Sequence, residues 1–153
     1  MKRKVAIVHD WLITIGGAEK VLRQLIIAYP EADVFCLFNF FDQQQRDEIL
    51  LGKKTRSTFL EHLPFSKTYY RHMVPIFYKV VERLDVSDYD IVISSSHAVA
   101  KGVKTREDQI HFCYCHTPMR YVWNMKKTYL SQISERYRKL ASGLYNWMPM
   151  GLR

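Results

Sequence analysis

The stretch VAIVHDWLITIGGAEKVL, residues 5–22, decides the fold class. Its first four residues, 5–8, form an unbroken apolar run, which is typical of a parallel strand that is covered on both faces. A loop follows that ends in two glycines at positions 16 and 17. Apolar residues then recur on one helical face from Ala18 to Tyr29, and Pro30 ends the helix. A buried strand, a glycine turn and an amphipathic helix together predict the first βα unit of an α/β domain.

The same alternation continues along the chain. Further strand-like runs stand at Asp33–Phe38, Thr55–Leu60, Asp90–Ser94 and Ile110–Cys115, and helical periodicity stands at Lys67–Leu84 and 130–148. Within the first of these helical segments we expect Pro75 to kink the helix without ending it. The alternation predicts a doubly wound parallel sheet, Rossmann-like, with right-handed crossovers. Such folds bind ligands at the carboxyl ends of the strands, near the point where the strand order reverses.

Composition and charge narrow the class of protein. The 153 residues are 48% hydrophobic and 25% charged, which favours one globular domain and excludes a disordered chain or a coiled coil. The net charge is +8, and it arises in residues 53–153, with 17 basic against 8 acidic side chains. This excess favours an anionic partner such as phosphate, nucleic acid or an acidic membrane surface. The three cysteines cannot form a disulfide framework, so we expect buried, reduced thiols in a cytosolic protein.

Three histidines follow strand-like runs, so the parallel sheet should bring His9, His97 and His116 to one edge. Any one of them alone would fit a hydrogen-bonded structural residue. His116 is the leading functional candidate, because it ends an apolar run and precedes Thr117 and Pro118. Its imidazole could bond a ligand hydroxyl or a developing partial charge while the backbone holds its other nitrogen. His97 is the second candidate, although it fits a turn cap equally well.

Gly16 and Gly17 precede a helix, so backbone N–H groups there could meet an anion. A plain tight turn fits the pair equally well. The loop is neither a dinucleotide fingerprint nor a Walker loop, which argues against an NAD-binding or nucleotide-hydrolysing domain. A metal site could be suggested by His111, Cys113, Cys115 and His116. Strand alternation puts the two cysteines on the face opposite His116, and no second Cys/His pair stands at zinc-like spacing, so we expect no metal. We also expect no cofactor. The chain also has no nucleophile elbow of the kind that hydrolases use.

Three blocks of sequence, in this order, resemble glycosyltransferase family 4 (GT4), in its bacterial mannosyltransferase-like polysaccharide branch. The blocks are VAIVHDWL with GGAEKVL at 5–12 and 16–22, ISSSHAVAKG at 93–102, and CYCHTPMRYVW at 113–123. The resemblance implies a GT-B enzyme, in which two Rossmann-like halves enclose the active site. The N-terminal half of such an enzyme binds the acceptor and the C-terminal half binds the nucleotide sugar. Transfer in the family retains the anomeric configuration and needs no metal.

The resemblance also implies roles for particular residues. Gly16 and Gly17 match the family's loop near the donor phosphates, and His116 matches a catalytic histidine close to the transferred sugar. His97 falls in the block that lines the acceptor side, and Arg120 would contribute positive charge near the cleft.

The chain departs from the family in length, because family members are about twice as long. We therefore expect residues 1–153 to be the N-terminal, acceptor-side Rossmann-like domain, lacking its last strand and the nucleotide-sugar-binding domain. Without the groups that stabilise the leaving diphosphate, this chain alone should not transfer sugar. An unpaired sheet edge should also make it marginally soluble or dependent on a partner.

The predicted function is thus the acceptor-side half of a retaining glycosyltransferase that moves a mannose- or glucose-type sugar during synthesis of cell-surface polysaccharide or lipopolysaccharide. Its partners would be a nucleotide sugar, bound through the other half, and a glycan or lipid-linked acceptor, at the cytoplasmic face of the membrane. An alternative is a non-catalytic module whose basic, aromatic segment Lys67–Leu84 docks on an anionic membrane or on a separate donor-domain chain. A third reading, a basic nucleic-acid binder, lacks a recognisable RNA or DNA module, so we expect no nucleic acid.

Overall fold

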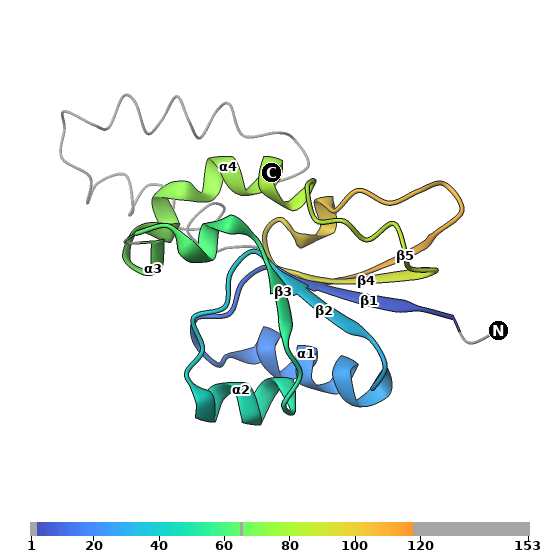
Figure 1. Cartoon of the computed structure of the whole chain (residues 1–153), viewed down its shortest axis with the longest axis horizontal. Helices are drawn as coiled ribbons and strands as arrows, with labels where there is room; N and C mark the ends of the chain where they lie inside the picture. The colour runs from blue at the N-terminus through green and yellow to red at the C-terminus, as the bar shows by residue number, and fades with distance from the viewer. Residues whose placement is uncertain (1–2, 65, 118–153) are drawn as a thin grey trace. The chain divides into compact units, whose positions relative to one another are not determined.

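The computed structural model describes residues 3–64 and 66–117, in which five parallel strands form one sheet (Figure 1). The spatial order of the strands is β3-β2-β1-β4-β5. Their bounds are β1 (Val5–His9), β2 (Asp33–Cys36), β3 (Thr55–Ser57), β4 (Ile91–Ser96) and β5 (Ile110–Cys115). The predicted α/β class with a parallel, Rossmann-like sheet is therefore confirmed.

The strand order reverses between β1 and β4. The chain runs outward from β1 through β2 to β3, and then crosses to the other side of β1 to form β4 and β5. The register pairs His9, the last residue of β1, with Ser95 near the end of β4. The carboxyl ends of these two strands therefore meet at the switch point, where doubly wound folds place their ligands.

Helices lie on both faces of the sheet (Figure 1). One face carries α1 (Gly17–Ala28) and α2 (Gln43–Leu50), and the other carries α3 (Ser66–Tyr69) and α4 (Val74–Val81). Short 3-10 turns complete the connections, namely η1 (Phe59–His62), η2 (Tyr70–Met73) and η3 (Ala100–Gly102). Among the described residues, no helix has the length and apolar character that crossing a bilayer requires.

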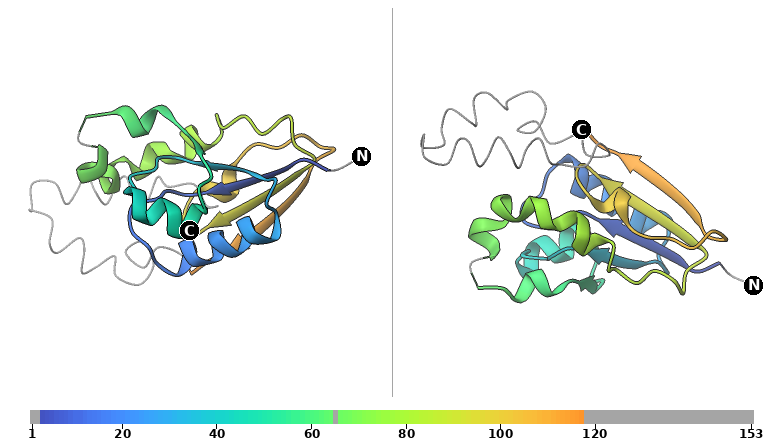
Figure 2. Two further views of the ribbon diagram at one scale, coloured as in Figure 1. Left: turned by 60° about the horizontal axis from the view of Figure 1, so that its bottom comes forward. Right: turned by 90° about the horizontal axis from the view of Figure 1, so that it is seen from above.

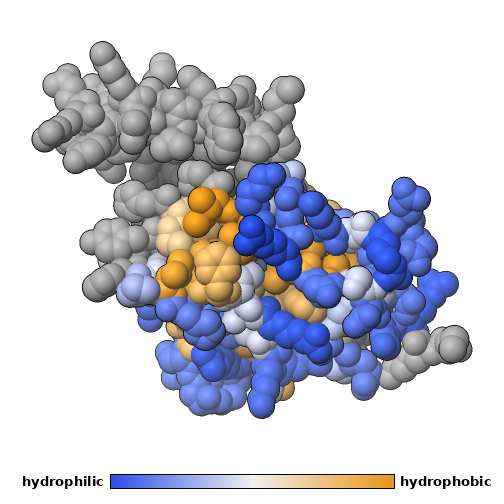
Figure 3. Space-filling view, turned by 45° about the horizontal axis from the view of Figure 1, so that its top comes forward, coloured by the Kyte–Doolittle hydropathy of each residue, from blue (hydrophilic) through white to orange (hydrophobic). Residues whose placement is uncertain are grey.

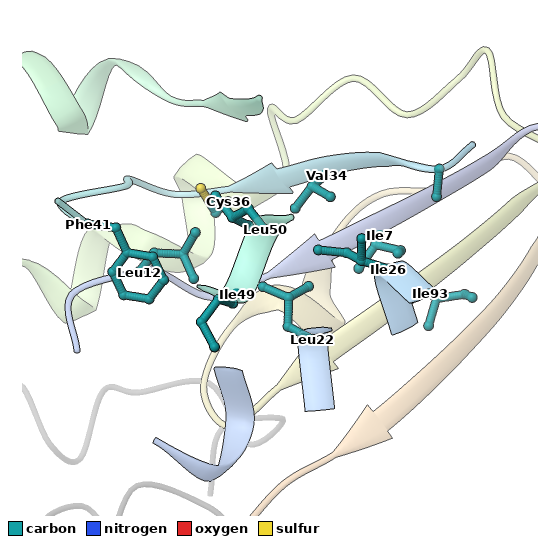
Figure 4. Packing of buried hydrophobic residues seen from close by; sticks show 11 residues of the cluster. Ile7, Leu12, Leu22, Ile26, Val34, Cys36, Phe41, Ile49, Leu50 and Ile93 are labelled. Carbon is teal, nitrogen blue, oxygen red and sulfur yellow. The ribbon is translucent and has the colours of Figure 1, made fainter. Parts of the chain in front are cut away.

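The core beneath α1 and α2 fixes the sheet against these helices (Figure 4). Leu22 and Ile26 point from α1 onto Ile7 and Ile93 of the central strands, and all four are nearly or fully buried. Full burial of one such side chain contributes about 1.5–3 kcal/mol. This packing holds the first turn of α1 close to the carboxyl end of β1.

One helix was not predicted from the sequence. Residues 43–50 are polar and lack a strong apolar stripe, yet they form α2 behind a capping box. The Asp42 carboxylate accepts the Gln45 N–H at 2.8 Å, and the Gln45 side chain accepts the Asp42 N–H at 3.1 Å. This reciprocal pattern is a sequence signal for a helix start that periodicity alone misses.

The prediction of one kinked helix over Lys67–Leu84 is wrong. The segment is divided into α3, η2 and α4, and Pro75 lies in the first turn of α4. A proline is tolerated there because the first N–H groups of a helix have no partner within the helix. The predicted third strand also ends early, at Ser57, because Thr58 caps η1. The predicted helix over 130–148 lies outside the described residues.

β5 lies at one edge of the sheet (Figure 2) and, within the described residues, pairs only with β4. Its side chains are mostly exposed, in contrast to the buried pattern of β1 and β4. Cys113 and Cys115 are therefore exposed and only Cys36 is buried, which corrects the expectation of three buried thiols. The apolar run of β5 resembled a central strand, but no described helix covers it.

Candidate functional site

The carboxyl ends of β1, β4 and β5 carry the polar side chains that the sequence pointed to. His9 ends β1 and is fully buried, and its Nδ1 lies 3.1 Å from the Oγ atom of Ser95 on β4. The same hydroxyl lies 2.9 Å from Nε2 of His116, which follows β5. One serine hydroxyl therefore joins two imidazoles from strands that are far apart in the sequence.

Glu19 extends this arrangement to the glycine loop. It lies in the first turn of α1 and is only 8% exposed. Its Oε1 lies 3.6 Å from Nε2 of His9, an ion-pair contact that is too long for a hydrogen bond. Its Oε2 accepts the Gly16 N–H at 2.7 Å. A continuous series of contacts thus runs from Gly16 through Glu19, His9 and Ser95 to His116.

A second buried carboxylate, Asp10, organises the loop after β4. Its two oxygens accept the backbone N–H groups of four consecutive residues at 2.6–3.0 Å, namely His97, Ala98, Val99 and Ala100. Consecutive N–H groups that converge in this way form an anion site, and here the chain's own carboxylate fills it. The Nδ1 atom of His97 also lies 2.9 Å from the carboxylate, without the alignment of a hydrogen bond.

Contacts between these groups lower the pKa values of the two carboxyl groups and raise the pKa of His97. Burial would raise the pKa of Asp10, but the His97 and His9 imidazoles and the backbone N–H groups outweigh it, so the pKa of Asp10 is lowered. The pKa of Glu19 is also lowered, because contacts with His9 and the backbone outweigh its burial. Burial would lower the pKa of His97, but the Asp10 carboxylate raises it.

His116 has a different environment. Burial lowers the pKa of its imidazole, and the neighbouring His9 and His97 lower it further. A lowered pKa favours the neutral ring at pH 7, which has one donor and one acceptor nitrogen. The Tyr114 ring, 4.8 Å away between centroids, packs beside it. His116 is therefore suited to hydrogen bonding and not to binding an anion by charge.

Aromatic packing holds His97 in place. The indole of Trp11 meets the His97 ring edge-on, with 4.7 Å between centroids. Trp11 in turn stacks on Phe38 and contacts Phe77 of α4. His97 is thus held between an aromatic cluster and a buried carboxylate.

The predicted convergence of the histidines at one edge is therefore found, with two corrections. The second nitrogen of His116 is held by the Ser95 hydroxyl and not by the backbone. The Gly16 N–H is already bonded to Glu19, so it is not free for a phosphate. A Cβ atom at Gly17 would meet nothing within 4 Å, so space remains at that position. Arg120 lies outside the described residues, and its role stays a prediction.

Sequence reasoning missed Asp10, Glu19 and Ser95 as members of this site. The sequence did contain signals for two of them. Asp10 directly follows a buried strand, and Ser95 is the middle residue of three serines at the end of another apolar strand. Polar residues in such runs need buried partners.

His111 does not belong to the site. The Nε2 atom of His111 bonds the Ser94 hydroxyl at 2.9 Å, and alternation along β4 puts Ser94 on the opposite face from Ser95.

No three His, Cys, Asp or Glu side chains gather in a metal-binding arrangement within residues 3–64 and 66–117. A hollow of about 600 Å³ lies at the amino ends of the strands, beside Val5, Asp33 and Tyr89, away from the histidines.

Comparisons with protein-family models, with curated proteins and with solved structures found no match to this chain.

Proposed function

We propose that this chain is the acceptor-side half of a retaining glycosyltransferase that transfers a mannose- or glucose-type sugar from a nucleotide sugar. The observation that supports this most is the meeting of Glu19, His9, Ser95 and His116 at the switch point between β1 and β4. This is the edge at which doubly wound folds bind their ligands. The resemblance of the three sequence blocks to GT4 supplies the reaction class.

The chemistry of the edge suits a sugar hydroxyl. A neutral His116 can accept a hydrogen bond from a hydroxyl or donate one to it. The exposed ring of Tyr114 beside it offers an apolar face of the kind that packs against a sugar ring. Space at Gly17 lets a ligand approach the backbone of the loop. The resemblance assigns the nucleotide sugar mainly to a second Rossmann-like half.

Glycan binding tests this proposal. We expect mannose- and glucose-containing oligosaccharides to shift the ring NMR signals of His116 and His97 in the full 153-residue chain, and H116A to weaken that binding severalfold. H111A is the matched control, because His111 is also bonded to a serine of β4 but faces the other side of the sheet. Shifts confined to His111, or no shift with any oligosaccharide, would reject an acceptor site at this edge.

A second candidate function, docking on an anionic membrane, is favoured by a different observation. Large apolar side chains of the 59–76 segment are exposed, including Phe59 at 52% and Ile76 at 47%. Lys67 and Lys79 from the same part of the chain are exposed too. Apolar side chains gather next to hydrophilic ones on the face drawn in Figure 3. Exposed apolar groups flanked by lysines suit the surface of an anionic bilayer.

Vesicle flotation tests the docking function. We expect the chain to float with phosphatidylglycerol vesicles at low salt, to dissociate at high salt, and not to bind phosphatidylcholine. I76S should reduce binding, whereas I27S should not, because Ile27 is equally exposed but lies on α1. Equal loss in both variants, or binding that ignores lipid charge, would exclude docking through this segment.

A further inference from the structure

We infer that Ser95, His9 and Glu19 form a buried positioning relay that holds His116 as its Nε2–H tautomer and presents a bare Nδ1 lone pair at the edge of the sheet. This inference rests on the proposed function for its biological meaning, because it specifies how His116 would meet a hydroxyl. The relay itself follows from contacts among the described residues.

The first step is the orientation of His9. The Oε1 atom of Glu19 is 3.6 Å from Nε2 of His9, and within the described residues that nitrogen has no hydrogen-bond partner. In the neutral form of His9 only one ring nitrogen carries a hydrogen, and the carboxylate beside Nε2 attracts the hydrogen to that nitrogen. The Nδ1 atom of His9 is then an acceptor.

The second step concerns the direction of the two hydrogen bonds that the Ser95 hydroxyl makes. A hydroxyl has one hydrogen and can accept as well as donate. Since Nδ1 of His9 is an acceptor, the Ser95 hydroxyl donates to it across 3.1 Å. The Ser95 oxygen is then an acceptor for His116, whose Nε2 lies 2.9 Å away and must carry the hydrogen. The proton of neutral His116 is thereby assigned to the nitrogen that faces the protein.

The third step concerns access. Ser95 and His9 have no exposed surface, and Glu19 is 8% exposed, so these three cannot meet a ligand themselves. Ser95 is therefore not a nucleophile, although it lies next to a histidine that contacts a carboxylate. His116 is more accessible than its three partners. Its Nδ1 would accept a hydrogen bond from a ligand hydroxyl, as a sugar acceptor requires before its oxygen can attack.

Tautomer-specific nitrogen NMR tests the inference in the full 153-residue chain without any substrate. At pH 7.5 we expect His116 to show the Nε2–H pattern. The charged groups that act on its ring are His9, His97, Asp10 and Glu19. S95A should raise the Nδ1–H share of His116 about fivefold, the ratio that corresponds to one hydrogen bond of about 1 kcal/mol. S94A is the matched control, because it removes the partner of His111 and should leave His116 unchanged.

A second variant tests the distant end of the relay. E19Q keeps an oxygen that can accept the Gly16 N–H but removes the charge beside His9. We expect the Nδ1–H share of His116 to rise in E19Q although Ser95 and His116 are untouched. An Nδ1–H pattern in the wild type, or no change of His116 in S95A or in E19Q, overturns the relay. Loss of glycan binding has no bearing on this readout, so the inference and the proposed function can fail separately.

Discussion

Replacing Asp10 with asparagine should destabilise the fold strongly although the two side chains have nearly the same shape. One carboxylate oxygen accepts the Val99 and Ala100 N–H groups, and the other accepts those of His97 and Ala98. An asparagine amide has only one acceptor oxygen, so its NH2 group must face two N–H donors whichever way it is turned. The D10N variant therefore leaves two buried backbone donors without acceptors.

The size of the effect follows from these two donors. A buried donor without an acceptor costs about 1–3 kcal/mol, so two cost about 2–6 kcal/mol. We expect the free energy of unfolding to fall by about 4 kcal/mol, a large part of the 5–15 kcal/mol that is typical of a domain. Asp10 has no exposed surface, so water cannot supply the missing acceptors.

Urea unfolding followed by circular dichroism measures this loss. With a slope of about 2 kcal/mol per molar urea, the midpoint of D10N should lie about 2 M below that of the wild type. D85N is the control, because Asp85 also accepts a backbone N–H, from Ser87, but is exposed. A midpoint shift in D10N no larger than that in D85N would refute the acceptor argument.

The pH dependence gives an independent check of the same carboxylate. The pKa of Asp10 is lower in the folded chain than the value of about 3.9 in an unfolded one. Its stabilising effect is therefore present above pH 4 and is lost as the pH falls toward the folded pKa. The difference in stability between wild type and D10N should shrink below pH 4, and a constant difference would contradict the assignment.

Three further predictions follow from single residues. H97N should lower the free energy of unfolding most below pH 6.5, where His97 is protonated beside Asp10. The loss should become smaller as the pH rises through the raised pKa of His97, and urea midpoints at several pH values would measure it. A thiol reagent should label Cys113 and Cys115 in the folded chain but Cys36 only after unfolding, because Cys36 is buried and burial raises the pKa of its thiol to about 12. Mass spectrometry of labelled peptides measures this difference. Labelling of Cys36 in the folded chain would contradict the buried core. G17A should raise the free energy of unfolding by about 0.5–1 kcal/mol in thermal or urea melts, because a Cβ there meets open space and alanine favours the helix; destabilisation would show that the space is not free.

The strands of the sheet could be predicted from the sequence because each one carries its own local signal. The runs that became β1, β4 and β5 are short, apolar and bounded by polar residues, and the parallel order then placed His9, His97 and His116 at one edge. The exposure of β5 could not be predicted in the same way. A run of apolar residues specifies a strand, but it does not specify whether a helix covers that strand.

The buried polar network could not be predicted, because its contacts join residues that are far apart in the chain. Asp10 is 87 to 90 positions from the four residues whose N–H groups it accepts, and His9 is 86 positions from Ser95. Local periodicity does not show which distant residues come into contact. What the sequence did offer was the presence of polar residues inside buried runs, which calls for a partner without naming it.

The two buried carboxylates bear on which ligand this edge can accept. The backbone N–H groups most suited to binding an anion already donate to carboxylates of the chain itself. Glu19 accepts the Gly16 N–H at the start of α1, and Asp10 accepts four N–H groups of the loop after β4. A phosphate at either place would have to displace a carboxylate or lie beside it, and like charges repel. The positive charge of the chain therefore does not by itself make a phosphate site at Gly16 or in the loop after β4. A neutral, hydroxyl-rich ligand would not be repelled by these carboxylates and could hydrogen-bond to the imidazole of His116, which is consistent with the acceptor glycan that we propose for this edge.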